Sequence, residues 1–168
     1  MRKNRLILIV LAILIAGGIF HAQYSWIRAK ADGSFCTCWI MMKPGDYVHV
    51  RRTPSKNGEI VGYMEPGDWF ETDAVSSNGY LRVCDFGEYG EGWVHLGYVV
   101  TQEPNQVMAQ AVCRTKSRVA IRRYMDGPKV SGNCWLVDGS TVTVFWEADG
   151  WSCTSRGFVK SEWLEVEQ

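Results

Sequence analysis

The stretch "VHVRR" at residues 48–52 recurs in altered form as "VAIRR" at residues 119–123. In both, two apolar residues flank a polar or small one before a pair of arginines. Alternation with a period of two is typical of a strand with one buried face, so Val48 and Val50 are predicted to face a core and His49 to face outward. The same beginning at two places points to an internal repeat.

Further pairs of matching segments follow both stretches in the same order and at similar spacing. They are "YMEPG" (63–67) with "WLVDG" (135–139), "GY" (79–80) with "GW" (150–151), and "GWVHLGYV" (92–99) with "GFVKSEWL" (157–164). The first copy carries six extra residues around "CDFGEYGEG" (84–92). Order and spacing together predict a tandem repeat of one small unit.

Each copy has the pattern of an all-β unit. The segment "STVTVFW" (140–146) alternates like the opening stretches and is rich in β-branched and aromatic residues. Glycines punctuate both copies at short intervals. A unit of about 50–55 residues with about five short strands favours a small, strongly bent barrel. The polar, proline-containing "TQEPNQ" (101–106) is predicted to belong to a linker.

Residues 47–99 resemble the bacterial SH3 family. They carry its V-x-V-R-x-x-P-S opening, a G-D turn, a G-W-V strand and a final aromatic–aliphatic pair. Residues 118–164 are a degenerate second copy, in which Met125-Asp126 replaces Pro54-Ser55, Ser140 replaces the Asp of the G-D turn, and Phe158 replaces Trp93. The resemblance covers about 100 of the 137 residues after position 31. It implies two tandem SH3-like β-barrels and assigns these core positions: Trp93, Tyr98, Phe158 and Trp163.

The N-terminus has the layout of an export signal. The basic "MRKNR" precedes the uncharged "LILIVLAILIAGGIF" (6–20), as in a secretory signal. Ala29-Lys30-Ala31 offers a cleavage site; without cleavage, the apolar segment is expected to be a membrane anchor with residues 32–168 outside. The predicted division is therefore 1–31 as signal or anchor, 32–46 as a Cys-containing segment, 47–100 as barrel 1, 101–117 as linker and 118–168 as barrel 2.

The charge distribution limits which classes of partner are expected. The chain has 18 Lys+Arg and 18 Asp+Glu, but residues 1–31 hold five of the cations and no acid, so residues 32–168 have a formal net charge of −5. Residues 32–113 contain 5 cations against 11 acids, and residues 114–168 contain 8 against 7. An acidic or neutral surface repels phosphate, so nucleic acid is not an expected partner. Contact with a membrane is expected only through the N-terminal segment.

Six cysteines follow the export segment, where disulfides are favoured over free thiols. Zinc is the alternative, but there is no C-x-x-C and no histidine close to Cys36-x-Cys38. In the alignment of the copies, Cys134 and Cys153 stand opposite Gly62 and Arg82. We therefore hypothesise a Cys134–Cys153 bridge. No metal or cofactor is expected.

No part of the chain outside the two copies is long enough for a catalytic domain, so no enzyme is expected. A nucleophilic pair of Cys84 with His49 or His95 is the competing interpretation; surface histidines and a bridged cysteine are favoured over it. Asp85, Glu88 and Glu91 lack the order of a calcium loop and are read as a solvated acidic loop.

Exposed aromatics are the candidate ligand-binding residues. Trp69 precedes Phe70; if Phe70 points inward, Trp69 points outward. Tyr47, Tyr63, Tyr80 and Tyr89 are expected to join it along a groove for an extended peptide or a sugar; the alternative is that each merely caps a small barrel. The expected function is a non-catalytic extracytoplasmic module for a cell-wall peptidoglycan peptide or another extended peptide. The alternative is a protein-interaction or inhibitor module acting on an exported partner.

Overall fold

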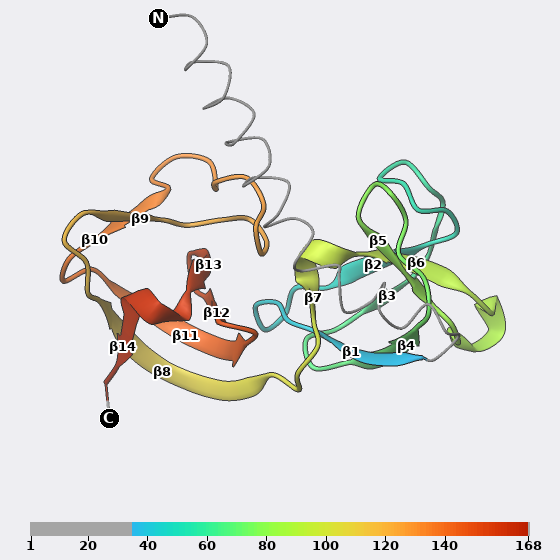
Figure 1. The fold of residues 1–168 in the computed structure, drawn as a ribbon, viewed down its shortest axis with the longest axis horizontal. Helices are drawn as coiled ribbons and strands as arrows, with labels where there is room; N and C mark the ends of the chain where they lie inside the picture. Colours follow the sequence, from blue (N-terminus) through green and yellow to red (C-terminus); the bar gives the residue numbers. More distant parts are fainter. Residues whose placement is uncertain (1–34, 168) are drawn as a thin grey trace, which may run out of the picture.

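The computed structural model describes residues 35–167, and these form an all-β protein (Figure 1). The fold class predicted from the alternating patterns is thereby confirmed at this level. The predicted signal or anchor, residues 1–31, lies outside the described residues. Among residues 35–167, no helix has the length and apolar character needed to cross a membrane.

The first copy contains seven strands in two antiparallel sheets. They are β1 (Cys36–Ile40), β2 (Val48–Arg51), β3 (Ile60–Met64), β4 (Trp69–Thr72), β5 (Tyr80–Val83), β6 (Gly92–His95) and β7 (Val99–Val100), with the short 3-10 helices η1 (Gly87–Tyr89) and η2 (Leu96–Tyr98). The strand orders are β3-β2-β6-β5 and β4-β1-β7. Val50, Leu81 and Val94 are fully buried between them. Val48 and Val50 face this core as the alternation predicts.

The second copy repeats the order of the elements from β8 onward but divides its strands differently between two sheets. Its elements are β8 (Asn105–Cys113), β9 (Arg118–Ala120), β10 (Trp135–Val137), β11 (Thr141–Ala148), β12 (Trp151–Thr154), β13 (Gly157–Lys160), η3 (Ser161–Trp163) and β14 (Leu164–Val166). The strand orders are β13-β12-β11-β8-β14 and β10-β9. Ile121, Leu136 and Val159 are buried in its core.

The repeat is visible in matching hydrogen bonds. Arg51 Nη1 donates to the carbonyl of Gly58 at 2.7 Å, and Arg122 Nη1 donates to the carbonyl of Gly127 at 2.6 Å. Each of these arginines closes the turn that follows its own strand. A one-turn 3-10 helix stands before the last strand of both copies, η2 before β7 and η3 before β14.

The division of the chain differs from the prediction at two places. Within the expected Cys-containing segment, β1 pairs with both β4 and β7; within the expected linker 101–117, β8 pairs with both β11 and β14. The backbone bonds agree, because Ile40 N donates to Asp68 O and Cys113 N donates to Ser140 O, each at 2.8 Å. Residues 101–117 are thus more than a linker, because they contain β8, which lies between β11 and β14 in the larger sheet of copy two.

The two copies also share a core. Met41 and Val100 of the first copy are fully buried against Trp151 and Phe158 of the second. Backbone contacts support this junction: Met125 N donates to Gly97 O at 2.9 Å. The copies therefore pack against each other as one body and are not two independent domains joined by a linker.

One expected core residue is exposed. Phe158 is buried and Trp93 and Tyr98 are half-buried, but Trp163 is 37% exposed. Tyr98 occupies the equivalent position in copy one, and its ring packs against Tyr124 and Phe158 with centroids 5.5 and 6.2 Å away. No aromatic ring among the described residues pairs with Trp163 in this way, so tertiary packing rather than the repeat sets its exposure.

Candidate functional site: an aromatic groove and a junction hollow

Four of the five predicted ligand-binding aromatics are exposed. Trp69 is 63% exposed while Phe70 is 4% exposed, so the predicted alternation holds. Tyr47, Tyr63 and Tyr89 are exposed as well. Tyr80 is 7% exposed and contributes only to the wall of a hollow. The five residues divide between two neighbouring hollows.

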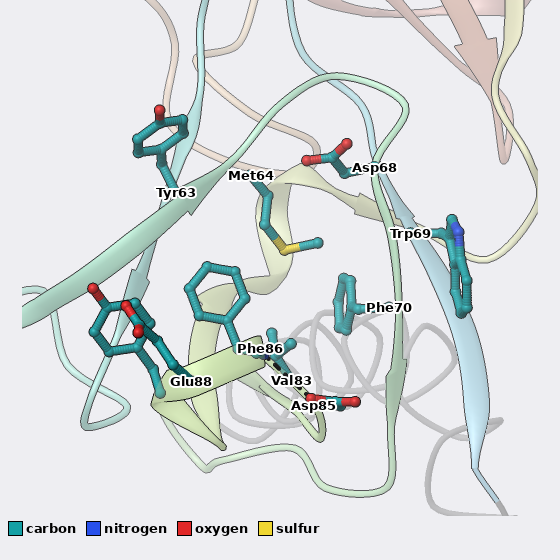
Figure 2. A pocket seen from close by; sticks show the side chains of 11 residues that line it. Tyr63, Met64, Asp68, Trp69, Phe70, Val83, Asp85, Phe86 and Glu88 are labelled. Atoms are coloured by element: carbon teal, nitrogen blue, oxygen red, sulfur yellow. Dashed lines mark hydrogen bonds between the residues drawn. The ribbon is translucent and has the colours of Figure 1, made fainter.

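The larger hollow, named here the aromatic groove, has a volume of about 510 Å³ and is open to solvent. Its lining residues are Tyr63, Met64, Asp68, Trp69, Phe70, Val83, Asp85, Phe86, Gly87, Glu88 and Tyr89. Figure 2 shows Met64, Phe86 and Phe70 in its middle, with Trp69 at one edge and Tyr63 and Glu88 at the other. Buried apolar side chains thus form its floor and aromatic and acidic ones its rim.

The six extra residues of the first copy build one wall of this groove. The loop before and through η1 carries Phe86, whose ring lies on Gly62 of β3. A β-carbon at Gly62 would meet Phe86 Cε1 at 2.5 Å, so the close approach requires glycine. In copy two this loop is shorter and Cys134 stands where Gly62 does. Sequence analysis missed Phe86, although the extra loop opposite a glycine was a usable signal.

The groove is negatively charged. Asp68, Asp85 and Glu88 are exposed on its rim, and no Lys or Arg belongs to its lining. Two of these carboxylates are held by backbone: Asp68 Oδ2 accepts from Glu65 N at 2.8 Å and Asp85 Oδ1 accepts from Gly87 N at 3.2 Å. Both residues line the solvent-open hollow. Such a rim attracts a cation.

The nearby Arg82 does not neutralise the rim, because it is already paired. Its guanidinium forms ion pairs with Asp73 and, at 3.4 Å, with Glu91. The hydrogen bond from Arg82 lowers the pKa of Asp73, and the same bond raises the pKa of Arg82. This three-residue network keeps the strand end of β5 beside the groove in place.

The smaller hollow, named here the junction hollow, has a volume of about 270 Å³ and lies where the two copies meet. Its lining residues are Met42, Tyr47, Val48, His49, Arg51, Tyr80, His95, Tyr98 and Tyr124. All belong to copy one except Tyr124. The Tyr124 ring reaches it by packing on Gly97, where a β-carbon would overlap the ring.

His95 is half-buried in this hollow rather than on the open surface as expected. Its ring lies edge-on to Tyr80 and Tyr124, with centroids 5.2 and 4.7 Å away, and its Nδ1 accepts from Gly97 N at 3.1 Å. Burial lowers the pKa of His95, which keeps it neutral at pH 7. With Nδ1 as acceptor, Nε2 carries the N–H.

The two hollows are adjacent. Tyr63 lines the groove and Tyr47 lines the junction hollow, and their ring centroids are 5.4 Å apart. Directly across from Tyr63 in the β2–β3 pair stands His49, whose ring is 5.3 Å from that of Tyr47. An exposed aromatic ridge therefore connects both hollows on one face of copy one.

The expected Cys134–Cys153 disulfide is absent, since all six cysteines in residues 35–167 are free. The hypothesis assumed that the two cysteines lie on neighbouring strands, and the structure does not place them so. Cys134 precedes β10, which pairs only with β9, whereas Cys153 lies buried in β12 between β11 and β13. The equivalent strands of copy one, β3 with Gly62 and β5 with Arg82, are also not neighbours, because β2 and β6 lie between them.

The thiols of Cys84 and Cys153 show no sign of activation as nucleophiles. Burial raises the pKa of Cys153 to about 12. Burial and the Asp73 carboxylate, 3.4 Å from its Sγ, raise the pKa of Cys84 to about 11. A nucleophilic cysteine needs the opposite, a cationic neighbour that stabilises the thiolate. Among the described residues, no three or more His, Cys, Asp and Glu side chains are placed to hold a metal ion.

Comparisons with known proteins find only distant structural similarity. No protein-family model and no curated protein matches the sequence. The chain is similar to the solved structure of NlpC2 from Trichomonas vaginalis, at 12% identity and a TM-score of 0.33 over 80% of this chain and 49% of that one. It is also similar to NlpC1 from the same organism, at 14% identity and a TM-score of 0.30 over 80% and 46%. The chain thus spans about half the length of these proteins, and similarity at these scores carries no functional argument.

Proposed function

We propose that this protein is a non-catalytic extracytoplasmic binding module, whose first copy takes an extended peptide of the cell wall into the aromatic groove. The observation that carries the proposal is the groove itself, an open hollow of about 510 Å³ rimmed by exposed rings. That volume lies within the range of about 300–1,000 Å³ typical of ligand sites. Trp69 and Tyr63, both more than 60% exposed, offer flat faces for stacking.

We propose further that each copy is an SH3-like barrel of the bacterial type. The support is the resemblance in residues 47–99, together with the short strands and the one-turn 3-10 helix before the last strand of both copies. Only the first copy has the groove-forming loop. We therefore expect copy one to bind the peptide and copy two to lack an equivalent groove, because the loop of copy two is shorter.

The absence of catalysis is supported by the chemistry of the nucleophile candidates. The acidic partner of Cys84 raises its thiol pKa, and His95 is surrounded by tyrosines rather than by that thiol. A thiolate–imidazole pair needs the two groups within hydrogen-bond reach of each other. The alternative binding partner is an exported protein, which the acidic rim of Asp68, Asp85 and Glu88 favours if the partner presents basic side chains.

Sedimentation of the mature protein with purified cell walls tests the proposal. Binding is expected, and Trp69→Ala should weaken it at least about tenfold, or about 1.4 kcal/mol. Trp163→Ala is the matched control, because Trp163 is an exposed tryptophan of copy two outside both hollows. Retained binding to protein-free peptidoglycan supports the wall ligand. Binding that disappears with the wall proteins supports the exported protein partner instead, and no sedimentation with either preparation overturns the wall-binding proposal.

A further inference from the structure

The two hollows carry opposite charge. The aromatic groove has three carboxylates and no Lys or Arg in its lining, whereas the junction hollow has Arg51 and no carboxylate in its lining. The Tyr47–Tyr63 contact connects them over an exposed ridge. One face of copy one therefore presents a negative end, an aromatic middle and a positive end.

The junction hollow is lined by hydrogen-bond donors. Arg51 uses Nη1 to hold the Gly58 carbonyl, and this is the only hydrogen bond of its guanidinium among the described residues. A guanidinium has five N–H donors and matches a carboxylate with two parallel bonds. His95 adds its Nε2–H, because Nδ1 is occupied as an acceptor. Tyr47 and Tyr124 also line the hollow, and each carries a hydroxyl that can donate to an anion.

The aromatic groove is suited to an ammonium group. Exposed carboxylates and exposed aromatic rings line it together, and both attract a cation. Glu88 stands in the first turn of η1 with its neighbour Tyr89. A primary amine on an extended chain meets there both a carboxylate and an aromatic surface.

We propose that the two hollows form one bipolar track for a zwitterionic extended peptide, with its amino group in the aromatic groove and its carboxylate in the junction hollow. The chain between them crosses the rings of Tyr63 and Tyr47. This inference rests on the proposed function and names the ligand end that each hollow receives. It also gives the second copy a part in binding. This copy has no groove of its own, but its Tyr124 lines the hollow that receives the carboxylate.

End-blocked peptides test the track. The probe is the free stem tripeptide L-Ala-γ-D-Glu-meso-diaminopimelate, compared with forms acetylated at the amino groups, amidated at the carboxyl groups, or both, by titration calorimetry at low salt and pH 7. Each single modification should weaken binding about tenfold or more, and the doubly blocked form should bind weakest. Equal binding of all four forms overturns the bipolar track and leaves the proposed function standing. No binding of any form overturns both.

Variants assign each end to its hollow. In the Glu88→Gln variant, acetylation of the peptide should no longer weaken binding, while amidation of the peptide still should. Arg51→Lys keeps the positive charge but not the paired donors. In this variant the effect of amidation should shrink, and acetylation should still weaken binding. Glu162→Gln is the matched control, because Glu162 is also an exposed acid in the first turn of a one-turn 3-10 helix, η3. It should reproduce the unmodified protein. Thermal unfolding checks that each variant is folded, and Tyr124→Phe, which keeps the ring on Gly97, is the second variant for the carboxylate end. Identical effects of Glu88→Gln and Glu162→Gln overturn the proposal.

Discussion

The ring of Phe86 lies on Gly62, close enough that a β-carbon there would meet its Cε1 at 2.5 Å. This contact fixes one wall of the aromatic groove, because the loop that carries Phe86 folds down only where β3 presents no side chain. The second copy has neither the glycine nor the loop. The copy with the groove thus differs from the copy without one both in this glycine and in the longer loop that packs on it.

Gly62→Ala is expected to weaken ligand binding with little loss of stability. The added methyl group displaces the ring end of Phe86, which sits on a surface loop and can move, so the free energy of unfolding should fall by no more than about 1 kcal/mol. The floor of the groove nevertheless changes shape. Wall sedimentation and urea unfolding measure the two effects.

The double variant Gly62→Ala/Phe86→Ala serves as the control for this contact. If the methyl group acts through the ring, it should add nothing once the ring is gone, and the double variant should bind like Phe86→Ala alone. Additive losses of binding from the two changes would show that Gly62 acts by some other route.

Trp151→Ala is expected to destabilise both copies together. Trp151 is 2% exposed and packs in the shared core with Met41 and Val100 of the first copy. Truncation of a buried tryptophan costs about 3–5 kcal/mol. Urea unfolding should show one cooperative transition in the unchanged protein and in the variant. Two separate transitions in the unchanged protein would contradict the shared core.

Trp151→Phe is the matched variant. The indole Nε1 of Trp151 is buried and makes no hydrogen bond among the described residues. Phenylalanine keeps most of the apolar contact and removes that unpaired donor, so it should cost much less than alanine. A loss as large as that of Trp151→Ala would mean that the N–H is bonded in solution.

Asp73→Asn is expected to make Cys84 more reactive. With a pKa of about 11, about one in a thousand Cys84 side chains is a thiolate at pH 8. Loss of the negative charge 3.4 Å from Sγ lowers that pKa and leaves Arg82 as the nearest charge, so alkylation by iodoacetamide at pH 8 should speed up several-fold. Peptide mapping of the Cys84 peptide measures the rate. Glu91→Gln, which removes the other acid bound to Arg82, should not raise it.

Stability is expected to fall between pH 7.5 and 5.5 because of His95. Burial lowers its pKa in the folded state below the unfolded value of about 6.5, so the unfolded chain binds more protons as the pH drops through this window. The contribution is complete above the unfolded pKa and is lost as the pH falls. In urea unfolding, His95→Gln should lose less stability over this interval than the unchanged protein. Equal losses would assign the pH dependence to other groups.

Much of the local structure was readable from the residues. Alternation placed Val48 and Val50 inward and Trp69 outward, because a strand sends successive side chains to opposite faces regardless of its partners. The doubled "VHVRR" and "VAIRR" stretches located the repeat, and the structure shows it in the paired bonds of Arg51 and Arg122. These features depend on local periodicity, which the chain carries by itself.

Long-range pairing decided the rest. That β8 is a strand, that Cys134 and Cys153 lie in different sheets, and that Tyr124 reaches a hollow of the other copy all depend on which segments meet. The polar stretch "TQEPNQ" leads into β8 because β11 pairs with Asn105 and Gln106, and β14 pairs with the other end of the strand at residues 111–113. The residues by themselves determined the repeat and its inward and outward faces. Only the tertiary structure brought Phe86 onto Gly62 and Tyr63 beside Tyr47, because contacts between distant segments follow from packing and not from period.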